Sequence, residues 1–180
     1  MEMIYKLLRS LKWTCSRFLY MNTLKMRIRK VRQKENIRVL FAVAETATWK
    51  NDTLYKAMLK HPRFTPLLLI LPDEQKEANL SKEEVDLCFD FFFKRGYACS
   101  YPYQNGKLIN IRKVLKPDII FYQKPYKAYP RSLLYYKNMN ALFCYTNYAF
   151  HSLLEEWANE NAFFRLVWQN YYENESAYAD

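Results

Sequence analysis

The sequence predicts an α/β protein whose core is a Rossmann-like, doubly wound and mostly parallel sheet of about five strands. Short apolar runs alternate with segments of helical periodicity along most of the chain. The runs are short and apolar, as expected for strands of a parallel sheet that is covered on both faces. The 180 residues suffice for one domain with a real core, and the aromatic content of 18% argues against disorder.

Residues 1–34 are predicted to form a basic helical arm that precedes an α/β domain of residues 35–180. The arm holds ten Lys or Arg and one acid, so that +9 of the chain's net charge of +10 belongs to it. Its apolar residues recur at three- and four-residue spacing, which places them on one helix face. These residues are Ile4, Leu7, Leu8, Leu11, Cys15, Phe18 and Leu19.

A basic amphipathic helix is typical of a membrane surface, where each basic residue near an anionic leaflet contributes about 1 kcal/mol. Two alternatives stay open, namely packing on protein and binding to nucleic acid. The membrane reading ranks first, and no nucleic-acid partner is expected. Its candidate residues are Lys6, Arg9, Lys12, Trp13, Arg17, Lys25, Arg27, Arg29 and Lys30.

The first half of the domain is predicted to hold two buried strands, at 36–46 and 64–72. Between them, Asn51 or Asp52 caps a helix that ends at His61-Pro62.

A further helix is expected to begin near Ser81, because Ser81 and Glu84 have the spacing of a capping box. Gly96 suits the end of that helix.

The second half of the domain repeats the alternation of strand and helix. Asn105-Gly106 is expected to form a turn. The last segment is interpreted as a loop and a helix with large aromatic residues. The other expected elements are a strand at 98–101, a helix around 108–115, a strand at 117–123, a helix at 131–138 and a strand at 141–148.

Composition excludes several kinds of site. The chain has two glycines, too few for a Walker loop or a GxGxxG fingerprint. Its four cysteines have no CxxC spacing and, with two histidines, form no metal signature. Free thiols in a reducing cytoplasm are therefore expected, with no metal and no cofactor.

Polar and aromatic side chains gather where three predicted strands end, which is the edge where open α/β sheets bind ligands. Lysines and helix N-termini suit phosphate, and tyrosine and tryptophan suit sugar or glycerol faces. The candidates for an acceptor cleft are Glu45, Thr48, Trp49, Lys50, Lys124, Tyr126, Lys127, Asn147, Tyr148 and His151.

Structural alternatives stand beside these candidates. Trp49 can simply cover the sheet edge, and Lys124-Pro125-Tyr126 can be only a turn. No nucleophile or orienting carboxylate is identifiable beside His151 in the sequence. No catalytic residue is assigned.

Three segments resemble the N-terminal half of bacterial CDP-glycerol glycerophosphotransferase-like proteins, over about residues 36 to 172. The first matches a Trp-Lys-x-Asp-x-Leu-Tyr turn and helix, the second a "KPDIIF…PY" segment, and the third a "Y-x-x-Y-G-F" strand end in which Ala149 replaces the glycine. The matching residues are Trp49, Lys50, Asp52, Leu54 and Tyr55; Lys116, Pro117, Asp118, Ile119, Ile120, Pro125 and Tyr126; and Tyr145, Tyr148 and Phe150.

The resemblance implies a GT-B transferase of cell-surface polymer synthesis, built from two Rossmann-like halves. In that family the C-terminal half binds the CDP-linked donor and carries catalysis, and the N-terminal half lines the acceptor side. The resemblance also implies a peripheral location at the inner face of the cytoplasmic membrane and a phosphate-containing or glycan acceptor. This chain is then expected to be the acceptor-side half, inactive without a separate donor-binding domain. The alternative is a non-enzymatic, membrane-associated interaction domain with the same fold.

Overall fold

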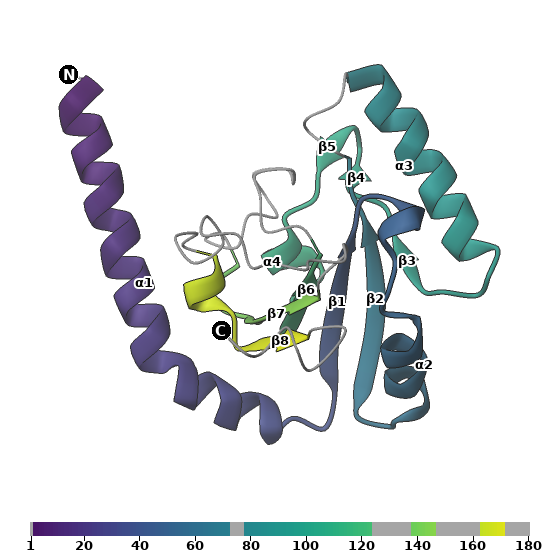
Figure 1. Ribbon diagram of the computed structural model, residues 1–180, viewed down its shortest axis with the longest axis horizontal. Helices are drawn as coiled ribbons and strands as arrows, with labels where there is room; N and C mark the ends of the chain where they lie inside the picture. The colour runs from purple at the N-terminus through teal and green to yellow at the C-terminus, as the bar shows by residue number, and fades with distance from the viewer. Residues whose placement is uncertain (1, 73–77, 124–137, 147–162, 172–180) are drawn as a thin grey trace, which may run out of the picture.

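A parallel sheet in Rossmann order forms the centre of the computed structural model, which describes residues 2–72, 78–123, 138–146 and 163–171. Its strands are β1 (Ile37–Val43), β2 (Phe64–Ile70), β3 (Cys99–Ser100), β6 (Ile119–Tyr122), β7 (Leu142–Thr146) and β8 (Gln169–Tyr171). They lie in the order β3-β2-β1-β6-β7-β8, and every neighbouring pair is parallel (Figure 1). Counted along the chain, this is the 3-2-1-4-5-6 order of the Rossmann fold, which confirms the predicted fold class.

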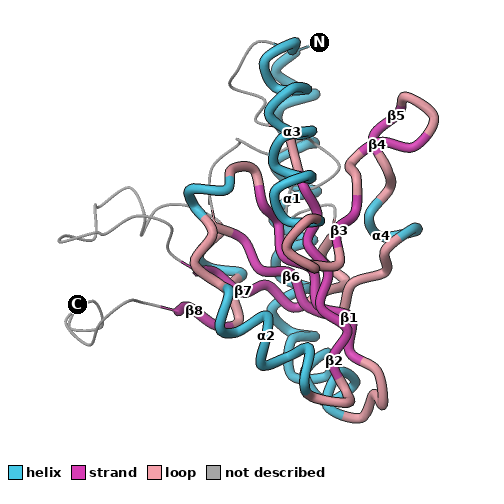
Figure 2. Tube along the Cα trace, turned by 90° about the vertical axis from the view of Figure 1, so that its right-hand side faces the viewer, coloured by secondary structure: helices cyan, strands magenta, loops and turns pink. Residues whose placement is uncertain are grey.

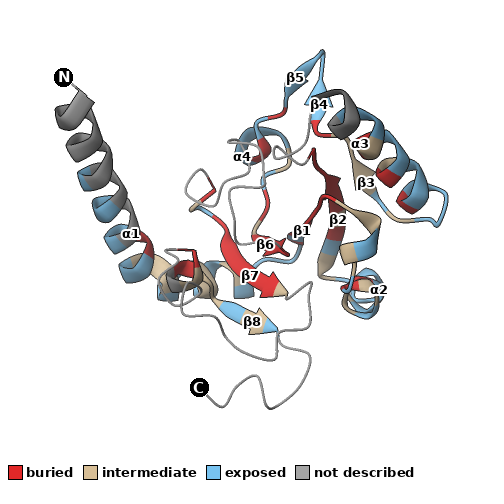
Figure 3. Ribbon diagram, turned by 45° about the horizontal axis from the view of Figure 1, so that its top comes forward, coloured by how far each residue is buried: buried red, intermediate tan, exposed pale blue. Residues whose placement is uncertain are grey.

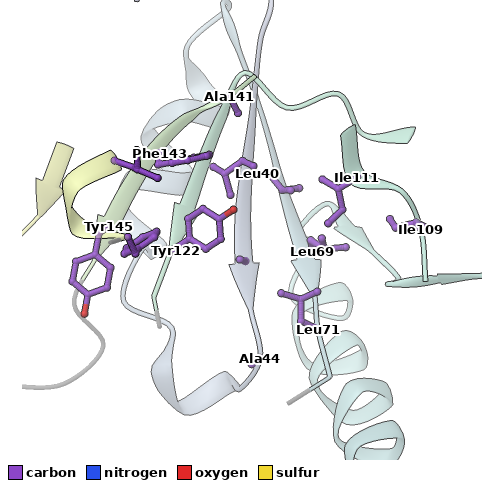
Figure 4. Close-up of a cluster of buried hydrophobic side chains, with 14 of the residues drawn as sticks. Leu40, Ala44, Leu69, Leu71, Ile109, Ile111, Tyr122, Ala141, Phe143 and Tyr145 are labelled. Atoms are coloured by element: carbon purple, nitrogen blue, oxygen red, sulfur yellow. The ribbon is translucent and has the colours of Figure 1, made fainter. Parts of the chain in front are cut away.

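The central strand β1 is apolar because both of its faces are covered. Its side chains alternate between two buried layers, with Leu40 and Ala42 in one and Val39, Phe41 and Val43 in the other. Figure 4 shows Leu40 in the first of these layers, together with aromatic side chains from β6 and β7. A strand with apolar residues on both faces is the pattern of a buried parallel sheet.

Helices lie on both sides of this sheet, so the fold is doubly wound (Figures 1 and 2). On one side, α2 (Asp52–Lys60) and α3 (Ala78–Phe93) contribute Tyr55, Val85 and Phe92 to the second layer. On the other side, α4 (Ile111–Val114) and the single turn η3 (Phe164–Leu166) contribute Ile111 and Leu166 to the first layer.

The N-terminal helix α1 (Glu2–Arg32) is continuous but has two different halves. Its second half lies against the sheet: Tyr20 is buried and stacks on Phe143 of β7 at 5.1 Å between ring centroids, and its hydroxyl donates to the Ala141 carbonyl at 3.3 Å. Leu24 and Ile28, one and two helical turns after Tyr20, also pack on the core. The first half extends away from the sheet (Figure 1).

One helix start is confirmed in position and one differs from the prediction. α2 begins at Asp52 with Asn51 as its N-cap residue, although the Asn51 side chain makes no capping hydrogen bond. α3 begins at Ala78, so Ser81 lies inside the helix rather than at its N-cap. The predicted end of α3 is confirmed, since Gly96 follows it with φ of +80°.

The C-terminal part of the sheet departs from the expected five strands. The last segment contributes β8 after the short turn η3, which gives a sixth strand where a helix was predicted.

The Asn105-Gly106 turn is confirmed and joins a hairpin of β4 (Tyr103–Gln104) and β5 (Lys107–Leu108) that the sequence did not predict. Both turn residues have positive φ, as a two-residue hairpin turn requires. The predicted helix at 131–138 falls almost wholly outside the described residues.

Candidate functional site

The strand order reverses between β1 and β6, which are neighbours in the sheet. Ligands of doubly wound proteins bind outside the carboxyl ends of the strands at such a switch point. Here β1 leads into the turn of residues 44–51 and then into α2, and β6 leads to Gln123. The candidates at the end of β1 are therefore at the point where this fold class carries its ligands.

The turn after β1 needs no glycine because it contains one turn of 3-10 helix, η1 (Thr46–Thr48). The Thr48 hydroxyl donates to the Glu45 carbonyl at 2.9 Å, and the Trp49 amide donates to the Thr46 carbonyl at 3.1 Å. No residue of this turn has positive φ. Hydrogen bonds within the loop therefore support a backbone conformation that needs no glycine.

Gln123 connects the two strand ends across the switch point. Its side-chain Nε2 donates to the Thr48 carbonyl at 2.7 Å, and its side chain is buried. Gln123 is not among the residues predicted for the site, although a polar residue that ends the apolar run "PDIIFYQ" was the available signal. This hydrogen bond fixes the β1 turn against the end of β6.

Trp49 points into the core rather than away from it. Its ring makes edge contacts with Phe41, Tyr55, Phe92 and Tyr97, at centroid distances of 5.5, 6.3, 5.5 and 6.0 Å. Aromatic edge contacts at such distances are each worth about 0.5–1.5 kcal/mol beyond burial. Packing therefore accounts for this tryptophan, in agreement with the alternative that it covers the sheet edge.

Asp52 and Tyr97 brace the start of α2. The Tyr97 hydroxyl donates to Asp52, and Lys56 Nζ lies 2.8 Å from the same carboxylate. The hydrogen bonds from Lys56 and then Tyr97 lower the pKa of Asp52. The Tyr55 hydroxyl accepts a hydrogen bond from the Ala98 amide at 2.9 Å. Two residues of the first motif that carries the resemblance, Asp52 and Tyr55, therefore hold α2 to the loop after α3.

The second motif also has a structural explanation. Lys116 lies just beyond α4 with φ of +48°, and its amide donates to the Ile111 carbonyl at 2.9 Å. The Asp118 carboxylate accepts hydrogen bonds from the Arg38 amide at 3.0 Å and from Lys34 Nζ. Asp118 therefore ties the segment after α1 to the start of β6.

Only part of the predicted cleft lies in the described residues. Lys50 is exposed, and Glu45 and Thr48 are half-buried at the same turn. The remaining candidates after β6 and β7 lie outside the described residues, and so their predicted proximity to Lys50 stays a prediction. They are Lys124, Tyr126, Lys127, Asn147, Tyr148 and His151.

The basic residues of α1 differ in their surroundings. Lys25, Arg29 and Lys30 are exposed. The Arg27 guanidinium lies over the Tyr20 ring, 4.3 Å from its centroid, and is held on the domain itself. The structure does not describe the side chains of the other membrane-surface candidates, which are Lys6, Arg9, Lys12, Trp13 and Arg17.

The four cysteines are free, as expected. Burial raises the pKa of Cys88 to about 12 and that of Cys99 to about 11, so both thiols are protonated near neutral pH. Within the described parts of the chain, no three His, Cys, Asp or Glu side chains are placed to share a metal ion. No helix in those parts combines the length and apolar character needed to cross a bilayer.

Fold and site together define a Rossmann-like α/β protein with a braced, glycine-free turn at its switch point. Comparison with family models, with curated proteins and with solved structures gave no match.

Proposed function

We propose that this chain is the acceptor-side half of a membrane-associated CDP-glycerol glycerophosphotransferase or glycosyltransferase of cell-surface polymer synthesis. The observation that supports the proposal most is the Rossmann strand order, with the turn of residues 44–51 at its switch point. A GT-B transferase has two such halves, and its acceptor and donor meet between them.

Lys50 is the residue proposed to attract the acceptor. It is exposed and directly precedes the N-cap residue of α2, where a cation and the positive end of the helix dipole favour a phosphate. Trp49 holds the turn by packing on Phe92, and Gln123 holds it by a hydrogen bond to the Thr48 carbonyl, so both residues position Lys50 rather than touch the acceptor. Catalysis is assigned to the donor-binding domain, and no residue of this chain is proposed to be catalytic.

Titration of a short glycerol-phosphate oligomer into the full chain tests this assignment. Lys50→Ala is expected to weaken binding roughly tenfold, because a charge-assisted contact to phosphate is lost. Lys60→Ala is the matched control, since Lys60 is an exposed lysine at the opposite end of α2. Absence of binding by the unchanged chain, or equal loss in both variants, contradicts the proposal.

The second candidate function is a non-enzymatic, membrane-associated interaction domain. It is favoured by the inward packing of Trp49, which explains the most distinctive residue of the turn without an acceptor. This alternative predicts no binding of the oligomer to the unchanged chain.

A further inference from the structure

An apolar stripe on α1 is left uncovered by the domain. Leu11, Phe18, Leu19 and Met26 are 55%, 69%, 61% and 53% exposed, and Cys15 is exposed among them. Positions 11, 15, 18, 19 and 26 recur at helical spacing, so they form one stripe along the helix, which we call the outward stripe. In Figure 3, much of the described part of the α1 ribbon has the colour of exposed residues.

The outward stripe is on the side of α1 opposite the docked side chains. Phe18 and Tyr20 are two positions apart, which is about 200° around an α-helix. Tyr20, Leu24 and Ile28 occupy the docked side and pack on the core. The helix therefore has two apolar sides, and while one is docked the sheet cannot cover the other.

The charge of α1 indicates what covers this stripe. The helix carries nine Lys or Arg and one acid, Glu2. Lys25 and Arg29 are exposed and continue the line of the outward stripe toward the end of the helix. The same helix of a second copy would bring like charges together, whereas an anionic lipid surface attracts them. Apolar residues beside basic ones are the pattern of a helix that lies in a bilayer surface.

We propose that the outward stripe inserts into the surface of an anionic lipid bilayer while the opposite side of α1 stays docked on the sheet. Because the two sides are separate, insertion needs no undocking of Tyr20. The docked helix then holds the domain in one orientation on the membrane, with Lys25 and Arg29 against the lipid headgroups. This inference deepens the proposed function, since it names the surface that keeps the domain at the membrane.

Vesicle flotation of the full chain tests the proposal. The unchanged chain is expected to bind vesicles that contain phosphatidylglycerol and to bind pure phosphatidylcholine weakly. Phe18→Ser with Leu19→Ser is expected to weaken binding at least tenfold. Leu59→Ser is the matched control, because Leu59 is 58% exposed on α2, away from the stripe. Lys25→Gln with Arg29→Gln is expected to weaken binding roughly fivefold for each charge removed.

A fluorophore on the exposed Cys15 reports insertion directly. Cys99→Ser leaves Cys15 as the accessible thiol, since Cys88 and Cys144 are buried. Insertion predicts a blue shift on anionic vesicles, and binding without a shift overturns insertion. Three results would each overturn the proposal. The serine variant binds vesicles as well as the unchanged chain, the unchanged chain does not bind vesicles, or the unchanged chain forms a dimer that the serine variant does not form. The vesicles contain no acceptor, so the result is independent of the Lys50 titration.

Discussion

The two sides of α1 show that forming a helix and docking it depend on different features of the sequence. Both sides belong to one uninterrupted helix. Tyr20 is 1% exposed and stacks on Phe143, while Phe18, two positions earlier, is 69% exposed. The local pattern of apolar residues is enough to form the helix, but only the residues that meet β7 and the end of the sheet are stabilised by burial.

Truncation of the docked tyrosine tests this difference most strongly. Tyr20→Ala removes a buried ring that stacks on Phe143 and leaves a cavity, so it is expected to lower the free energy of unfolding by about 3–5 kcal/mol. Phe18→Ala removes an exposed ring and is expected to change it by less than about 0.5 kcal/mol. Urea denaturation of both variants measures the two values. Equal losses would show that the outward stripe of α1 is also packed on protein in solution.

Asp118 is expected to make the next largest contribution to stability, at the junction between α1 and the sheet. Asp118→Ala leaves the Arg38 amide without its carboxylate acceptor and is expected to cost about 1–3 kcal/mol. Lys34→Ala removes only the half-exposed cation from the same carboxylate and is expected to cost at most about 1 kcal/mol. Denaturant unfolding in low salt measures both. A larger loss for the lysine variant would mean that the ion pair, rather than the backbone contact, holds this junction.

The short, continuous apolar runs made most of the sheet predictable. The runs that became β1, β2, β6 and β7 lie in the interior, where burial on both faces leaves a continuous apolar signal. β8 was missed because its three residues are at the sheet edge and are mostly polar or exposed. Over three residues, strand alternation cannot be distinguished from one turn of a helix.

The position of the turn after β1 could be predicted from the sequence, but the packing of its side chains could not. Parallel strands place their carboxyl ends at one edge, so the importance of the β1 turn followed from the strand assignment. That Trp49 packs inward depends on Phe92 and Tyr97, which come from α3 and its following loop. Contacts between residues so distant in sequence are not visible in local spacing. The same holds for the hydrogen bond from Gln123 to Thr48.

Alkaline pH provides a third test of the docked side of α1. Burial raises the pKa of Tyr20, with the Arg27 guanidinium as a smaller opposing cause. The native pKa then lies above the unfolded value of about 10, so the contribution to stability is complete below pH 10 and is lost as the pH rises above it. The loss is expected to reach up to about 1.4 kcal/mol per pH unit. Tyr20→Phe removes this dependence while it keeps the ring, and parallel stability profiles of the two proteins above pH 10 would contradict the buried position.

Arg27 and Lys25 test whether the two sides of α1 have separate roles. Arg27 lies over the Tyr20 ring and donates to the Tyr20 carbonyl at 3.3 Å, so Arg27→Gln is expected to lower stability by about 0.5–1 kcal/mol. Because this guanidinium is held on the domain, its loss is expected to change vesicle binding little. Lys25 is exposed, and Lys25→Gln is expected to do the reverse, with unchanged stability and weaker binding to anionic vesicles. Paired unfolding and flotation measurements on both variants separate the two sides. If both variants lost binding equally, basic charge anywhere on α1 would suffice, and the docked side would have no role distinct from the outward stripe.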